Sequence, residues 1–146
     1  MLRLATYGGV AEVLLRLVHV YTVDLLPSIE GRRRFNARPA GYQYSILDIG
    51  GRELAAYHWH PDGNSPVTSP HLHVPGAEPV TMAQRPGSPR EGAKTHLGKV
   101  HFPTCHIYSD DIAELLIRDL AVVPARTDWQ AVLQENREVT ERGLAP

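Results

Sequence analysis

Two H-x-H steps are the parts of this sequence best suited to chemistry. The first is His58 and His60, and the second is His71 and His73. In a β-strand, residues two positions apart point to the same face, so each step would project two imidazoles together. If the two strands are neighbours, four imidazoles meet on one surface. Taken singly, either step is equally compatible with a solvated strand face that has no chemical role.

Clustered imidazoles suit two chemistries. In acid–base catalysis a neutral histidine removes a proton and a charged histidine donates one, as cleavage of RNA by its own 2′-hydroxyl requires. In metal ligation each H-x-H step offers two nitrogen ligands. A zinc or manganese ion would then be held by His58, His60, His71 and His73, with His101 or His106 as a further ligand. We favour the first chemistry, which needs no cofactor, and keep the second as the alternative.

Basic residues near the histidines are candidates for binding a phosphate. Arg32, Arg33 and Arg34 form a dense cluster in a segment that we expect to be a loop after Pro27. Lys94 and Lys99 stand beside other histidines. Both groups could contact an anionic substrate, and a solvated surface is the alternative for each.

The strands that must position the histidines are predicted from turn signals. Gly50 and Gly51 separate two runs of strand-forming residues, 42–48 and 53–60, which predicts a hairpin. The segment 69–74 reads as a short strand, and we expect it to pair with this hairpin.

Helices are predicted on both sides of these strands. Glu12, Arg16 and His19 recur at helical spacing among apolar residues, which favours an amphipathic helix over 10–21. The later part, 19–25, is rich in β-branched and aromatic residues, so a strand is the alternative there.

Two further helices are predicted near the carboxyl end of the sequence. The oxygen-bearing side chains of residues 109–111 can cap a helix that Pro124 ends, and a capping box at Thr127 and Gln130 opens another that closes near Gly143. The Pro- and Gly-rich stretch 75–94 reads as a long flexible loop. We therefore expect a single α+β domain over 1–146, in which a small antiparallel sheet packs against an N-terminal and two C-terminal helices.

Charge and composition exclude several classes of protein. The 15 Lys and Arg residues balance 16 Asp and Glu residues, so no global field attracts nucleic acid or membranes. The most apolar stretch is interrupted by charges, which argues against a membrane span. The one cysteine excludes an internal disulfide framework and favours a reducing compartment. We expect a soluble, cytoplasmic protein, for which self-association stays open.

Four neighbouring segments form a pattern: A-Y-H-W-H-P-D-G, S-P-H-L-H-V, H-F-P-T and the helix expected to begin at Asp110. This pattern resembles the TumE-like toxins of prokaryotic toxin–antitoxin systems. The resemblance covers about residues 42–122, and the basic segment and the stretch 75–94 depart from it. It implies a growth-inhibiting toxin that acts on RNA and pairs with a helix-turn-helix antitoxin. It points to His71 and His73 first, and matches His58, His60 and His101 less closely.

The leading hypothesis from the sequence is therefore a toxin that cleaves RNA without a metal. A histidine-ligated metal hydrolase and a non-enzymatic binding protein are the alternatives.

Overall fold

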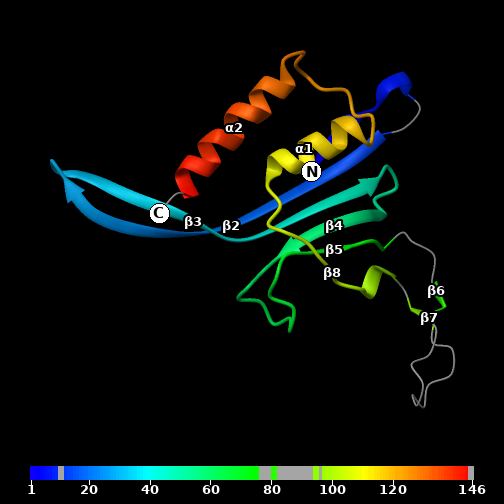
Figure 1. Ribbon diagram of the computed structural model, residues 1–146, viewed down its shortest axis with the longest axis horizontal. Coiled ribbons are helices and arrows are strands. Elements are labelled where there is room, and N and C mark those ends of the chain that lie inside the picture. The colour runs from blue at the N-terminus through cyan, green and yellow to red at the C-terminus, as the bar shows by residue number, and fades with distance from the viewer. Residues whose placement is uncertain (10–11, 76–79, 82–93, 96, 145–146) are drawn as a thin grey trace.

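The computed structural model describes residues 1–9, 12–75, 80–81, 94–95 and 97–144. Within these residues a six-stranded antiparallel sheet forms the centre of the fold (Figure 1). Its strands, in spatial order, are β1 (Leu2–Ala5), β2 (Glu12–Ile29), β3 (Arg32–Asp48), β4 (Glu53–Trp59), β5 (His71–His73) and β8 (Phe102–Pro103). A separate pair is formed by β6 (Val80–Thr81) and β7 (Lys94–Thr95). The expected α+β class and antiparallel sheet are confirmed.

Two helices lie over one face of this sheet (Figure 1). Helix α1 spans Ser109–Arg118 and α2 spans Trp129–Leu144, as the capping signals predicted. Short 3-10 helices occur at Tyr7–Gly9 (η1) and Leu97–Lys99 (η2). Neither α1 nor α2 is long and apolar enough to cross a membrane, and the same holds for every helix among the described residues.

The core forms where α1 meets the first strands of the sheet. Its buried side chains come from β2, β3, α1 and the segment after α1: Val13, Leu15, Tyr42, Tyr44, Ile46, Ile112, Leu116 and Val122. On β2 and β3 these residues alternate with residues of the opposite face, where Ser45 and Leu47 of β3 are also buried. The opposite face of the sheet is free of α-helices in the described structure and carries the histidines.

The predicted N-terminal helix is wrong. Residues 12–29 form strand β2, which pairs with β3 from Val13 to Ile29, whereas residues 10 and 11 lie outside the described part. Val13 and Leu15 are buried two residues apart, which is the period of a strand. The polar residues of the same segment are spaced three and four apart, which is why the sequence suggested a helix. The strand alternative for 19–25 is confirmed, in keeping with its β-branched residues.

The segment expected to be an arginine-rich loop is also part of the sheet. Glu30 and Gly31, both with positive φ, form a two-residue turn that joins β2 to β3, so residues 32–34 begin a strand. The Gly50–Gly51 turn joins β3 to β4 and confirms the predicted hairpin. Of the predicted loop 75–94, residues 76–79 and 82–93 lie outside the described part, and the rest includes β6 and β7.

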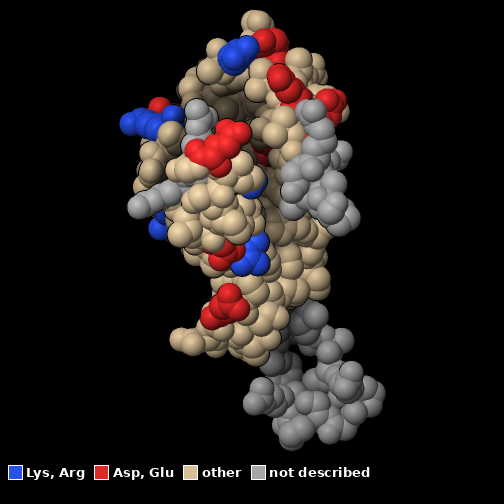
Figure 2. Space-filling view, turned by 90° about the vertical axis from the view of Figure 1, so that its left-hand side faces the viewer, with Lys and Arg blue, Asp and Glu red and all other residues tan. Residues whose placement is uncertain are grey.

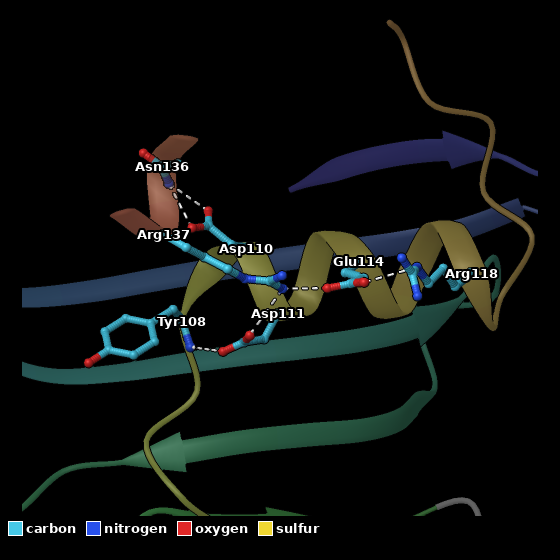
Figure 3. A network of polar contacts seen from close by, with 7 residues as sticks. All are labelled: Tyr108, Asp110, Asp111, Glu114, Arg118, Asn136 and Arg137. Atoms are coloured by element: carbon cyan, nitrogen blue, oxygen red, sulfur yellow. Dashed lines mark hydrogen bonds and ion pairs between the residues drawn. The ribbon is translucent and has the colours of Figure 1, made fainter. Parts of the chain in front are cut away.

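Polar contacts fasten α2 to α1 (Figure 3). The nearly buried Asp110 carboxylate accepts hydrogen bonds of 2.7 and 2.8 Å from the Asn136 side chain. Arg137, one residue further along α2, forms ion pairs with Asp111 and Glu114 of α1. Asp111 also accepts a 2.8 Å hydrogen bond from the Tyr108 backbone N–H, which caps α1. These contacts hold α1 and α2 together on the side of the sheet opposite the histidines.

Candidate histidine site

Strands β4 and β5 bring the two H-x-H steps onto the same face of the sheet. In the antiparallel register His58 lies opposite His71, and His73 lies opposite Ala56, two residues away from His58. His60 follows directly after the end of β4. The intervening Tyr57 and Leu72 pair with each other and therefore point to the helix-covered face.

A fifth imidazole joins them from the segment between η2 and β8. The ring centroid of His101 lies 4.8 Å from that of His71 and 4.6 Å from that of His73. His58 lies 5.0 Å from His73 and 5.7 Å from His71, and His60 lies 5.6 Å from His71. We call these five residues the histidine cluster. The fully buried His71 stands at its centre, in contact with all four others.

Backbone carbonyls orient two of these rings. Nδ1 of His71 lies 2.8 Å from the carbonyl oxygen of Ser69, and Nδ1 of His73 lies 3.1 Å from that of Gly98. A carbonyl can only accept, so each Nδ1 must carry the proton that is donated, and each neutral ring keeps its lone pair on Nε2. Nε2 of His58 is buried and has no hydrogen-bond partner among the described residues. One ring nitrogen of each of these three histidines lies within 4.8 Å of the other two.

The surroundings favour neutral imidazoles. Burial lowers the pKa of His58 to about 4, and the neighbouring His73 adds to this effect because two positive charges would repel. Burial also lowers the pKa of His71, although its hydrogen bond to Ser69 acts in the opposite direction. Near neutral pH both rings are therefore uncharged, with lone pairs available.

These pKa values predict how the metal-free protein responds to acid. Because the folded pKa of His58 lies below the value of 6.5 for an exposed histidine, the unfolded chain binds more protons between these two values. We expect the free energy of unfolding to fall as the pH is lowered from 6.5 towards 4. Urea denaturation in chelator across this range measures the slope. A His58→Gln variant should show a shallower slope, and an unchanged slope would contradict the assignment.

The structure separates the other candidate residues. Lys99 is exposed and follows Gly98, whose carbonyl holds His73, so Lys99 lies beside the cluster. Lys94 lies in β7, opposite Thr81. Arg34 is nine residues along β3 from Gln43, the partner of His58, which corresponds to about 30 Å of strand. Arg32 and Arg33 lie further still along the strand, so the arginines and the histidines occupy different regions.

The two candidates for a further metal ligand, His101 and His106, lie on different sides of the sheet. His101 joins the cluster, whereas His106 packs edge-on against Tyr42 and Trp59, with ring centroids 5.0 and 4.8 Å away. Those two aromatic residues belong to the helix-covered side of the sheet. His106 is thus separated from the cluster, and burial lowers its pKa.

Two features of the site were not predicted from the sequence. The carbonyls of Ser69 and Gly98 belong to the backbone, and residue type does not reveal what they bind. A groove of about 500 Å³ also adjoins the cluster at His60, with Val18 and Val20 of β2 along one side and Trp59 along another. It was missed because β2 was predicted to be a helix.

Comparison of the chain with protein-family models, curated proteins and solved structures finds no match.

Proposed function

We propose that the histidine cluster binds a divalent transition-metal ion, in the first place Zn²⁺, and that the protein is a metal-dependent hydrolase. The observation that carries this proposal is the convergence of one ring nitrogen each from His58, His71 and His73. Imidazole nitrogen is a preferred ligand of zinc, and catalytic zinc sites commonly use three protein ligands and leave one position open.

The hydrogen bonds around the cluster support this choice. Histidines that ligate a metal usually donate their other ring N–H to a carbonyl or carboxylate, which fixes the tautomer and aims the free nitrogen at the metal. His71 and His73 each have such a carbonyl partner. For His58, a metal ion would also satisfy the buried Nε2 that otherwise has no partner among the described residues.

The spacing requires a small adjustment on binding. Two nitrogens on one tetrahedral zinc ion lie about 3.4 Å apart, whereas those of the three histidines are spread over as much as 4.8 Å. The three imidazoles would therefore have to move closer together when the ion binds. His60 and His101 stand next to these ligands, where they could add a fourth nitrogen or accept a proton. When bound, zinc lowers the pKa of a coordinated water to near neutrality and so supplies a nucleophile.

The neutral rings favour the metal-dependent mechanism over the metal-free one. Acid–base cleavage needs a charged imidazole as the acid, and the lowered pKa values of His58 and His71 make these two residues unsuited to that role. Metal ligation instead requires neutral imidazoles. RNA stays the proposed substrate and a helix-turn-helix antitoxin the proposed partner, on the strength of the family resemblance. Lys99 would be the cation beside the cluster that contacts a phosphate.

A chelator experiment tests the proposal. After dialysis against a chelator, we expect the purified protein to bind Co²⁺ with the visible absorption of a nitrogen-ligated ion, and to cleave RNA only when Zn²⁺ or Mn²⁺ is restored. Undiminished cleavage in excess chelator would overturn the metal mechanism in favour of the metal-free one. Failure to bind Co²⁺ or Zn²⁺ would overturn the metal site itself. Metal binding without any RNA cleavage would contradict the hydrolase and support the binding-protein alternative.

A further inference from the structure

A two-stranded arm extends from the sheet. Strand β1 pairs with β2 only along Glu12–Leu15, and β4 pairs with β3 only along Tyr42–Leu47. Beyond these limits β2 and β3 continue together to the turn at Glu30 and Gly31. We call residues 21–39 the arm, and Figure 1 shows it projecting away from α1 and β4.

The two faces of the arm differ in chemistry. On one face the cross-strand pairs are apolar: Tyr21 with Pro39, Val23 with Ala37, and Leu25 with Phe35. On the other face the pairs are largely polar: Thr22 with Arg38, Asp24 with Asn36, and Leu26 with Arg34. Asp24 and Arg38 form a 2.7 Å ion pair on this second face. The arm is therefore amphipathic, which is typical of a sheet with one face packed against another element and the other face in water.

The apolar face continues the face that is buried in the core. Val13, Leu15 and Tyr21 have the same parity on β2, so the side of the strand that packs under α1 runs outward along the arm. There it is largely exposed: Tyr21, which lines a hollow together with Thr140 of α2, is 52% exposed, Val23 62%, Leu25 67% and Phe35 62%. A two-stranded ribbon alone is marginally stable in water, so an arm of this length gains from a partner.

We propose that the apolar face of the arm docks against the same face of a second copy of this chain, forming a dimer with two-fold symmetry. No charged side chain lies among its six residues, so the surface fits an equally uncharged partner and not a polyanion. The arm of another copy has this chemistry and the same length. A two-fold interface requires a self-complementary patch, and an uncharged, flat ribbon face meets that requirement.

The area is sufficient for such a dimer. The exposed parts of these apolar side chains amount to roughly 600 Å² per copy, which is at the upper end of apolar patches on monomers. Two copies together would bury about 1,200 Å², the lower bound of stable, specific interfaces. Stacking would give a two-layer, four-stranded assembly with both polar faces in water. Figure 2, which views the molecule from the side toward which the arm projects, shows charges of both signs scattered over a largely uncharged surface.

Sedimentation of the full chain tests the proposal, with charge substitutions on each of the two faces. We expect the wild type to have twice the chain mass at micromolar concentration, the Leu25→Glu/Phe35→Glu variant to be monomeric, and Thr22→Glu, on the polar face, to remain dimeric. Co²⁺ binding should be unchanged in all three, since none of the substituted residues belongs to the histidine cluster. A monomeric wild type up to millimolar concentration, or a dimeric double variant, would overturn the proposal.

Cross-linking keeps the test decisive if the double variant fails to fold. In a Cys105→Ser background, Val23→Cys places a thiol in the middle of the apolar face, and Thr22→Cys places one on the opposite face. Mild oxidation should give a disulfide-linked dimer with Val23→Cys and not with Thr22→Cys. Equal cross-linking of both variants, or of neither, would contradict the face-to-face arrangement.

Discussion

Replacing His71 with alanine is expected to lower the affinity of the protein for Zn²⁺ by at least about 100-fold. Loss of a residue that only hydrogen-bonds to a metal ligand already lowers metal affinity by up to about 100-fold. His71 is 1% exposed and contacts the other four rings of the histidine cluster. Its loss removes one nitrogen and the contacts that space the others. Competition with a chromophoric chelator measures the affinity, and any metal-dependent RNA cleavage should disappear in parallel.

Two further variants separate metal binding from folding. His73→Ala removes a half-buried ligand and should lower the Zn²⁺ affinity with a smaller effect on stability, because its side chain leaves a less enclosed space. His19→Ala is the matched control, since His19 is exposed and packs on Tyr21 and Tyr44 at the opposite face. Its affinity should equal that of the wild type. An unchanged affinity in His71→Ala, with the fold intact, would remove the cluster as the metal site.

The local parts of the site could be predicted from the sequence, because strand parity and turn chemistry act over a few residues. The Gly50–Gly51 turn fixes the β3–β4 hairpin, and the H-x-H spacing places His58 with His60 and His71 with His73. The capping signals at residues 109–111 and at Thr127 likewise predicted two helices that the structure contains, although the N-cap of α1 is Tyr108. Each of these signals is read within one element or one turn.

The rest depended on contacts between distant segments. Strand β2 was read as a helix because its polar residues have a helical spacing over two turns, and only pairing with β3 along 17 residues settles the choice. The choice of His101 over His106 has the same origin. Gly98, at the centre of η2, holds His73 beside His101, whereas His106 packs against Tyr42 on the other side of the sheet. No short-range pattern distinguishes these two positions.

Replacing Tyr44 with alanine is expected to lower the free energy of unfolding by about 3–5 kcal/mol, the usual cost of removing a large buried aromatic side chain. Tyr44 is 1% exposed and lies in the part of β3 that belongs to the core. Its ring stacks on Tyr42 at 4.7 Å and meets His19 at 5.2 Å. The cavity left by alanine would lie between the sheet and the helix layer. Urea denaturation of the metal-free protein measures the change, and Tyr44→Phe, which keeps the ring, should lose no more than about 1 kcal/mol.

The same variant tests whether the two faces of the sheet act separately. Tyr44 points toward the helices, whereas His58, His71 and His73 point to the other face, so the folded fraction of Tyr44→Ala should keep the wild-type affinity for Zn²⁺. Apparent binding would then fall only in proportion to the unfolded fraction, and saturating Zn²⁺ would raise the melting temperature as it does in the wild type. A lower affinity of the folded form would instead mean that the helix layer determines the spacing of the imidazoles. His71→Ala should show the converse result, in which metal affinity is lost while most of the protein remains folded.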